Sequence, residues 1–221
     1  MEKMNSKESK SLLATDEILT NTRNLLATID KEIEGIELDS NDRNVLSGSL
    51  FDVVLDHSKA IVLSLENKIY ASAYALARPL FESFVKAAWI QHCASDSEIT
   101  LIIERDKFKL SFGKMLDAVE NEREWPKTLT ELKASVWNSM HSYTHGGLQL
   151  ISRRLKNGFI EHDVDEQEVA GLLQIVALIS FLSFNEAVGM SKGGEKYKVL
   201  SDLYQDLSSW CFTLQPNRHR T

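Results

Sequence analysis

The sequence predicts an all-α protein, an up-and-down helical bundle of about seven to eight helices. Apolar residues recur at the spacing of an amphipathic helix through most of the 221 residues. No run of alternating β-branched residues lies between turn signals, so no sheet is expected. Because neither a repeat nor a linker divides the chain, we expect one domain over residues 1–221, with residues 1–10 and 215–221 disordered.

Three helices are expected in the first half of the chain. Apolar residues at helical spacing predict a first helix over residues 11–33, and Gly35 marks its end. A polar turn separates it from a second helix over residues 42–66. Residues 69–93 follow almost at once, so the second and third helices should form an antiparallel hairpin. Apolar residues surround the third helix on every side, which predicts that it is the buried centre of the bundle.

Capping motifs and glycines divide the second half. A serine, threonine or aspartate followed three residues later by glutamate is typical of a helix start. Gly146 and Gly147 should break one helix, Gly158 should end the next, and an irregularity is expected near Gly113. The last helix has the plainest amphipathic pattern of the chain. The expected starts are Ser95 with Glu98, Thr128 with Glu131 and Asp165 with Glu168, which gives helices over residues 95–120, 128–145, 148–156, 165–190 and 197–214.

Charge and cysteine content indicate an ordinary cytoplasmic protein. The net charge of −7 argues against a broad, non-specific DNA-binding surface but leaves room for a local basic cleft. Cys93 and Cys211 lie far apart in apolar contexts and are expected to be reduced thiols. The polar N-terminus lacks the apolar core of a signal peptide. Residues 169–190 approach the length of a membrane span, but polar residues such as Asn185 and Glu186 interrupt them, so a buried core helix and no membrane association are expected.

Three charged residues lie inside the central helix. Arg78, Glu82 and Lys86 follow one another at intervals of four, so they share one stripe of the helix. Charges in a core helix are costly unless they are paired, which makes this stripe the first place to look for a site. Pro79 removes one backbone donor and should kink the helix, releasing the carbonyl of Ala75 next to Arg78.

Two histidines offer a second set of functional groups. His141 and His145 are four residues apart and would point the same way on a helix, a spacing that metal sites use. A metal ion would need Glu82, His57 or His92 as a third ligand from another helix. Neither H-E-x-x-H nor C-x-x-C is present, so no metal and no cofactor is predicted.

A metal-free site is the other possibility. Arg78 could hold an anionic phosphate in its planar fork, and Glu82 could orient a histidine. His141 or His145 could exchange protons near neutral pH. These four residues are the predicted catalytic set, which suits phosphodiester cleavage or phosphate binding without turnover. In the structural alternative, Arg78 pairs with Glu82 and the histidines only brace helices.

Two groups of residues carry a resemblance to a known family. They are Arg78-Pro79-Leu80-Phe81-Glu82 with Trp89 and His92-Cys93-Ala94, and then Thr144-His145-Gly146-Gly147 with Ser152-Arg153-Arg154. Over about residues 45–190 the chain resembles a group of uncharacterised bacterial proteins catalogued as a domain of unknown function. That group is distantly similar to helical HEPN-type domains, which occur in toxin-antitoxin and antiphage systems, often as dimers with RNase activity.

The chain departs from the HEPN pattern in one respect. HEPN RNases usually carry R-x-x-x-x-H, or a slightly longer spacing, late in the domain. No arginine here has a histidine at that distance, and Arg154 and His162 are too far apart and separated by Gly158. The usual catalytic pair therefore cannot be assigned, and a site would have to be assembled between helices.

Together, the residues and the resemblance predict a cytoplasmic, defence- or toxin-related, HEPN-like protein. It would bind RNA or a nucleotide phosphate in a polar pocket between helices, with metal-independent RNA cleavage as the candidate activity. A homodimer is expected from the amphipathic last helix and the apolar helix before it, and an antitoxin-type protein is a candidate partner. The alternative is a non-catalytic helical interaction module in which Arg78 and Glu82 form a structural network.

Overall fold

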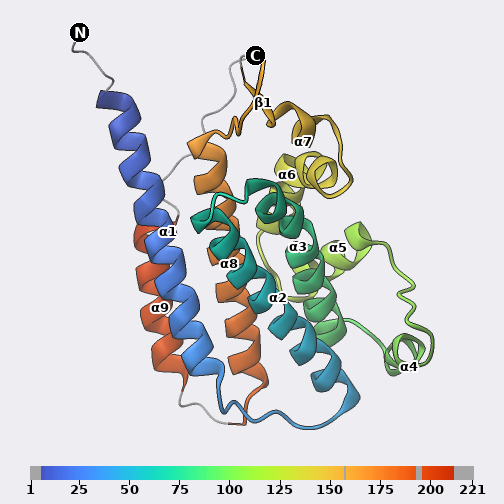
Figure 1. Ribbon diagram of the computed structural model, residues 1–221. Helices are drawn as coiled ribbons and strands as arrows, with labels where there is room; N and C mark the ends of the chain where they lie inside the picture. The colour runs from blue at the N-terminus through green and yellow to red at the C-terminus, as the bar shows by residue number, and fades with distance from the viewer. Residues whose placement is uncertain (1–5, 157, 193–195, 212–221) are drawn as a thin grey trace.

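The computed structural model describes residues 6–156, 158–192 and 196–211, and it confirms the expected all-α bundle (Figure 1). The one sheet among these residues is a two-stranded hairpin. The helices are α1 (Ser6–Ile33), α2 (Asp42–Glu66), α3 (Tyr70–His92), α4 (Asp96–Arg105), α5 (Phe112–Glu122), α6 (Thr128–Thr144), α7 (Leu148–Ser152), α8 (Glu166–Met190) and α9 (Tyr197–Trp210), and the strands are β1 (Leu155–Lys156) and β2 (Phe159–Ile160).

Helix α3 forms the centre of the bundle, as its apolar sequence predicts. It packs against α2, α5, α6 and α8, while α1 and α9 cover α8 from the other side (Figure 1). The α3 side chains Leu80, Phe81, Phe84 and Trp89 are fully buried. Burial of large aromatic and aliphatic side chains is the main driving force for folding, so α3 anchors the core.

Helix α8 is a core helix. Among the described residues it is the one helix long and apolar enough to cross a membrane, but 56% of its most apolar window is buried inside the protein. It packs against α1, α2, α3 and α9. This is weak evidence for a membrane span, and the fold is compatible with a soluble protein.

The chain termini are described only in part. Helix α1 already begins at Ser6, so it reaches into the segment 1–10 that was predicted to be disordered. Residues 1–5 and 215–221 lie outside the described part of the chain.

The single helix expected over residues 95–120 is two helices. Its start is as predicted, because Ser95 and Glu98 form a complete capping box. Helix α4 then ends at Arg105, the next residue, Asp106, adopts the left-handed conformation with φ +48°, and α5 starts after Ser111. The irregularity predicted near Gly113 is thus a full break over residues 106–111, and Gly113 itself lies in the first turn of α5.

The N-terminus of α6 is capped from another helix. The predicted box of Thr128 and Glu131 is wrong, because the N-cap residue is Lys127 and no side chain of the segment caps it. Instead, the buried carboxylate of Glu120 accepts hydrogen bonds from the backbone N–H groups of Leu129 and Thr130, both at 3.0 Å. This contact joins α5 to α6 and satisfies donors that a helix start leaves unpaired.

The predicted helix over residues 148–156 is also partly wrong. Helix α7 stops at Ser152, and a hairpin follows in which Leu155 pairs with Ile160 around Gly158, at φ +84°. A glycine at positive φ allows so tight a reversal, which a helix pattern in the sequence does not reveal.

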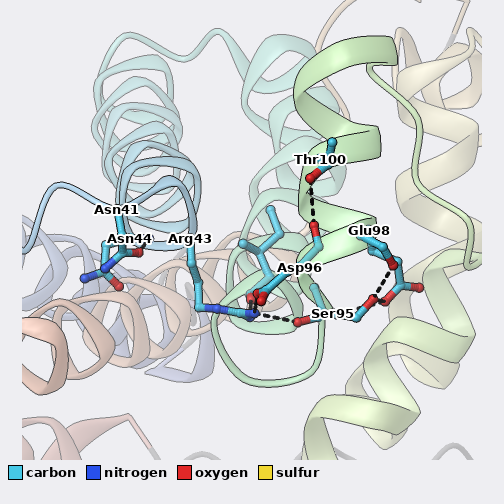
Figure 2. Close-up of polar contacts among 10 residues, drawn as sticks. Asn41, Arg43, Asn44, Ser95, Asp96, Glu98 and Thr100 are labelled. Atoms are coloured by element: carbon cyan, nitrogen blue, oxygen red, sulfur yellow. Dashed lines mark hydrogen bonds and ion pairs between the residues drawn. The ribbon is translucent and has the colours of Figure 1, made fainter.

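Arg43 of α2 closes the C-terminal end of α3 (Figure 2). Its guanidinium donates to the carbonyl oxygens of Ile90 and Ala94, the latter at 2.7 Å, and to the carboxylate of Asp96 at 3.2 Å. Carbonyls at a helix end have no partner within the helix, so a cation from α2 supplies one.

Candidate functional site

The four residues predicted to form a site do meet. Arg78 Nε donates to Glu82 Oε1 at 2.8 Å, and Arg78 Nη1 lies 2.6 Å from His141 Nδ1 and 3.4 Å from His145 Nε2. The two imidazole rings lie 4.5 Å apart between centroids. Arg78 thus joins α3 to the C-terminal end of α6.

The site forms where two regularly spaced sets of side chains face each other. On α3 these are Arg78 and Glu82, one turn apart, and on α6 they are Trp137 and His141, with His145 just past the helix end. The carbonyl of Ala75, which Pro79 cannot satisfy, accepts a hydrogen bond from Thr144 Oγ1 at 3.4 Å. The predicted release of this carbonyl therefore provides a second contact between the two helices.

An aromatic surface that sequence reasoning missed underlies the arginine. The Arg78 guanidinium lies 4.7 Å from the centroid of the Trp137 ring, and Trp137 stacks on Phe112 at 4.6 Å. The Lys133 ammonium lies 5.7 Å from both rings. The signal was present in the sequence, because Lys133, Trp137, His141 and His145 follow one another at intervals of four, like the charges of α3. We call Arg78, Glu82, Trp137, His141 and His145 the Arg78 cluster.

The Arg78 cluster is accessible to solvent rather than sealed in the core. The side chains of Arg78 and Glu82 are 21% and 26% exposed, and both histidines are exposed. Arg78 is always charged, so for it to donate to His141 Nδ1 that nitrogen must be unprotonated, with the ring proton on Nε2. Nε2 of His141 would then be available as a donor to a bound ligand.

One nitrogen of the Arg78 guanidinium, Nη2, has no hydrogen-bond partner among the described residues. Nε and Nη1 make the contacts described above, whereas no hydrogen bond among the described residues engages Nη2. Glu82 balances the charge of Arg78 but contacts it through Nε only. An anion could therefore approach the Nη2 side of the guanidinium without displacing Glu82.

The other residues considered for a site lie elsewhere. His92 binds the buried Glu186 at 2.6 Å, and Lys86 lies over the Phe108 ring at 5.3 Å. His57 is half-buried on α2 and makes no hydrogen bond to the cluster among the described residues. Within that part of the chain no three His, Cys, Asp or Glu side chains come together as metal ligands.

The two cysteines are separate thiols, as expected. Burial raises the pKa of Cys93 to about 11 and that of Cys211 to about 12, so both stay protonated at neutral pH. A protonated thiol is a poor nucleophile, and neither cysteine belongs to the Arg78 cluster.

One further arginine and histidine meet although their sequence spacing does not fit the HEPN pattern. The hairpin brings Arg154 Nη1 to 3.2 Å from His162 Nδ1, and His162 packs edge-on against Tyr70. Their spacing along the chain still departs from R-x-x-x-x-H, but the turn at Gly158 closes the gap between them.

Comparisons with known proteins give one match. Neither the search of curated proteins nor the search of solved structures found a match. A family of unknown function, DUF6988, matches residues 51–213, which include α3, α6 and the whole Arg78 cluster. The match confirms the expectation of an uncharacterised domain family and extends beyond the predicted range of 45–190 at its C-terminal end. The chain belongs to the DUF6988 family of unknown function.

Proposed function

We propose that the protein binds RNA or a nucleotide through a phosphate group held by the Arg78 cluster, and that it cleaves the bound phosphodiester without a metal ion. One observation carries the proposal: Arg78 meets both His141 and His145 at an accessible surface, beside the ring of Trp137. A guanidinium next to an aromatic ring is a common way to hold a phosphate and its neighbouring base.

The charged and aromatic side chains in and next to the Arg78 cluster support a nucleic-acid ligand more than a simple anion. Arg78 and Lys133 supply two cations next to the stacked rings of Trp137 and Phe112, and a base can stack on the plane of the Arg78 guanidinium, which already lies over the Trp137 ring. Because the whole chain carries a net charge of −7, attraction to phosphate must come from this local group. We therefore expect a short contact with one or two phosphates and not a long basic groove.

The two histidines supply the proton transfers of the cleavage step. In the RNA-bound state Arg78 donates to the phosphate instead of to His141. One neutral imidazole then takes the proton of a ribose 2′-hydroxyl as its oxygen attacks the phosphorus, and the other, as imidazolium, gives a proton to the departing 5′-oxygen. The products are a 2′,3′-cyclic phosphate and a 5′-hydroxyl. Arg78 offsets the negative charge that develops on the phosphorane, and general acid–base catalysis of this kind contributes roughly 10²- to 10⁴-fold to the rate.

The wider role in this proposal is that of a defence- or toxin-related HEPN-like protein acting in the cytoplasm, with an antitoxin-type protein as its partner. The all-helical bundle and the sequence resemblance support it.

An RNA cleavage assay tests the activity. Unstructured RNA is incubated with the protein in EDTA, and the ends of the products are identified by mass spectrometry. We expect 2′,3′-cyclic phosphate ends, and we expect His141→Ala and His145→Ala each to lower the rate at least about 100-fold. His162→Ala is the matched control, an exposed histidine outside the cluster that should leave the rate unchanged. If His162→Ala abolishes cleavage and the other two do not, the active site is at the hairpin and the proposal is wrong.

A second candidate function is a protein-interaction module, and a group of exposed apolar side chains favours it. They lie on α7 and the hairpin, where Ile160 is 90% exposed. Exposed apolar clusters of this kind mark interaction surfaces. The group consists of Leu148, Ile151, Leu155, Phe159 and Ile160, which we call the hairpin patch.

A further inference from the structure

A cavity of about 210 Å³ lies between α3, α6 and α8, apart from the Arg78 cluster. Its walls are mainly apolar, formed by residues such as Ala77, Val136, Leu172 and Ile175. The exposed Gln149 of α7 lies at its rim, which opens it to solvent. Since a cavity of about 150 Å³ accommodates benzene, this one has room for a substituted ring.

Two residues of the lining each carry a buried side-chain oxygen that has no partner among the described residues, Tyr74 Oη and Glu168 Oε2. Tyr74 is only 9% exposed, and its ring stacks on Tyr143 at 4.6 Å, which fixes its position. A buried polar atom without a hydrogen bond costs free energy, so such atoms are rare in folded proteins. The third atom of this kind among the described residues, Thr22 Oγ1, lies outside the cavity, so two of the three belong to residues that line it and are candidates for contact with a ligand.

The neighbouring contacts leave these two atoms available. Arg153 binds the other oxygen of Glu168 and is hydrogen-bonded to Tyr143. These contacts hold the side chains of Glu168 and Tyr143, which both line the cavity, in place. Burial strongly raises the pKa of Tyr74, and the charge of Glu168 raises it further, so its hydroxyl stays protonated and can donate. Burial also raises the pKa of Glu168, while Arg153 lowers it.

Gly171 also contributes to the size of this cavity. It lines the cavity from the second turn of α8, and a Cβ built on it would meet no atom within 4 Å. Alanine would fit there and would favour the helix, since glycine inside a helix is destabilising. The absence of a side chain therefore enlarges the cavity at the expense of helix stability.

We propose that this cavity binds a small, flat nitrogen heterocycle with an amino group next to a ring nitrogen. The ring would lie between the apolar walls, the amino group would donate to Glu168 Oε2, and the ring nitrogen would accept from Tyr74 Oη. Adenine and cytosine carry this pair of groups, and so does 2-aminopyridine. The cavity shares no lining residue with the Arg78 cluster, so this inference stands whether or not RNA binds there.

Isothermal titration calorimetry of the full chain with 2-aminopyridine and adenine tests the inference. We expect binding of both, and binding of pyridine, which lacks the amino group, weakened about three- to tenfold through the loss of one hydrogen bond. Tyr74→Phe keeps the ring and removes the hydroxyl, so it should weaken 2-aminopyridine to a similar extent. It should also raise the melting temperature of the free protein, because the unpaired group is gone.

Gly171→Leu fills the cavity and is the decisive variant. It should abolish binding while circular dichroism and the melting temperature show an intact fold, and Gly171→Ala should reduce binding less. Arg78→Ala should leave the affinity for 2-aminopyridine unchanged, which separates this site from the phosphate site. Unchanged binding in Gly171→Leu, equal binding of pyridine and 2-aminopyridine, or no binding of any probe at millimolar concentration would each overturn the inference.

Discussion

At the residue scale, the role of Arg78 depends on how exposed its ion pair is. Breaking a buried ion pair costs about 3–5 kcal/mol, whereas an exposed pair one helical turn apart contributes about 0.3–0.5 kcal/mol. The side chains of Arg78 and Glu82 are between a fifth and a third exposed, and both histidines next to them are exposed. This environment is closer to the exposed case, which favours a functional group over a structural network.

The stability of two variants tests this assignment. We expect Glu82→Gln to lower the free energy of unfolding by less than about 1 kcal/mol. Arg78→Ala should cost about 1–2 kcal/mol, because its contact with the Trp137 ring is lost as well. Urea denaturation measures both, with Arg23→Ala, which breaks the exposed pair of Arg23 and Glu66, as the control. A loss of about 3 kcal/mol or more in either cluster variant would show that the pair is structural.

His57 gives a prediction about pH. Burial lowers its pKa, although the neighbouring Asp56 raises it somewhat. A base whose pKa is lowered in the folded state is protonated more readily in the unfolded chain, so stability should fall as the pH drops below about 6.5. His57→Gln should remove this part of the pH dependence and leave stability above that pH nearly unchanged. Equal slopes of melting temperature against pH for the two proteins in mildly acidic buffer would contradict it.

At the element scale, several helix ends are fixed by contacts from distant parts of the chain. Arg43 of α2 caps the end of α3, and Glu120 of α5 caps the start of α6. Both helices, α3 and α6, carry residues of the Arg78 cluster. They fix the ends of α3 and α6, the two helices between which Arg78 meets His141.

Removing the Arg43 contact should destabilise the whole fold. Arg43→Ala leaves the carbonyls of Ile90 and Ala94 without their donor, and hydrogen bonds to charged groups contribute about 1.5–3 kcal/mol. We expect a loss of about 2–3 kcal/mol in urea denaturation. Arg105→Ala removes an exposed arginine from α4 and serves as the control. If both variants unfold at the same urea concentration, Arg43 does not cap α3.

Local signals predicted most elements, and contacts between distant residues account for the misses. Gly35 and the Ser95 capping box act within a few residues, so the sequence alone located the ends they mark. Glu120 caps a helix start that lies several residues further on, after a charged loop, and no spacing rule anticipates it. The hairpin around Gly158 replaced a predicted helix, because its strands are too short to show an alternating pattern.

At the scale of the whole molecule, the bundle places two sets of evenly spaced side chains opposite each other. The sequence identified Arg78, Glu82, His141 and His145 as candidates because each set has helical spacing. It could not show that α3 and α6 are neighbours, nor that Trp137 lies beneath Arg78, because both depend on packing. Tyr74 and Glu168 were missed for the same reason, since their lack of partners exists only in the folded chain.

The proposed homodimer is a prediction at this scale. Helices α8 and α9, which motivated it, bury apolar side chains within the chain, so the hairpin patch is the better candidate interface. Light scattering at micromolar concentration should give twice the chain mass of 25.0 kDa. Ile160→Glu should give the monomer mass without lowering the melting temperature. A wild-type protein of monomer mass would remove the homodimer.

The most direct test of the central claim is the affinity for RNA with and without Arg78. Fluorescence anisotropy of a labelled, unstructured RNA is recorded against protein concentration at several salt concentrations. The account predicts that Arg78→Ala weakens binding at least about tenfold and reduces the slope of log affinity against log salt by about one, as expected for the loss of one phosphate contact. Arg105→Ala, which also removes one positive charge, should bind like the wild type. Equal affinity of the two variants, or no binding of RNA by the wild type, would contradict the account.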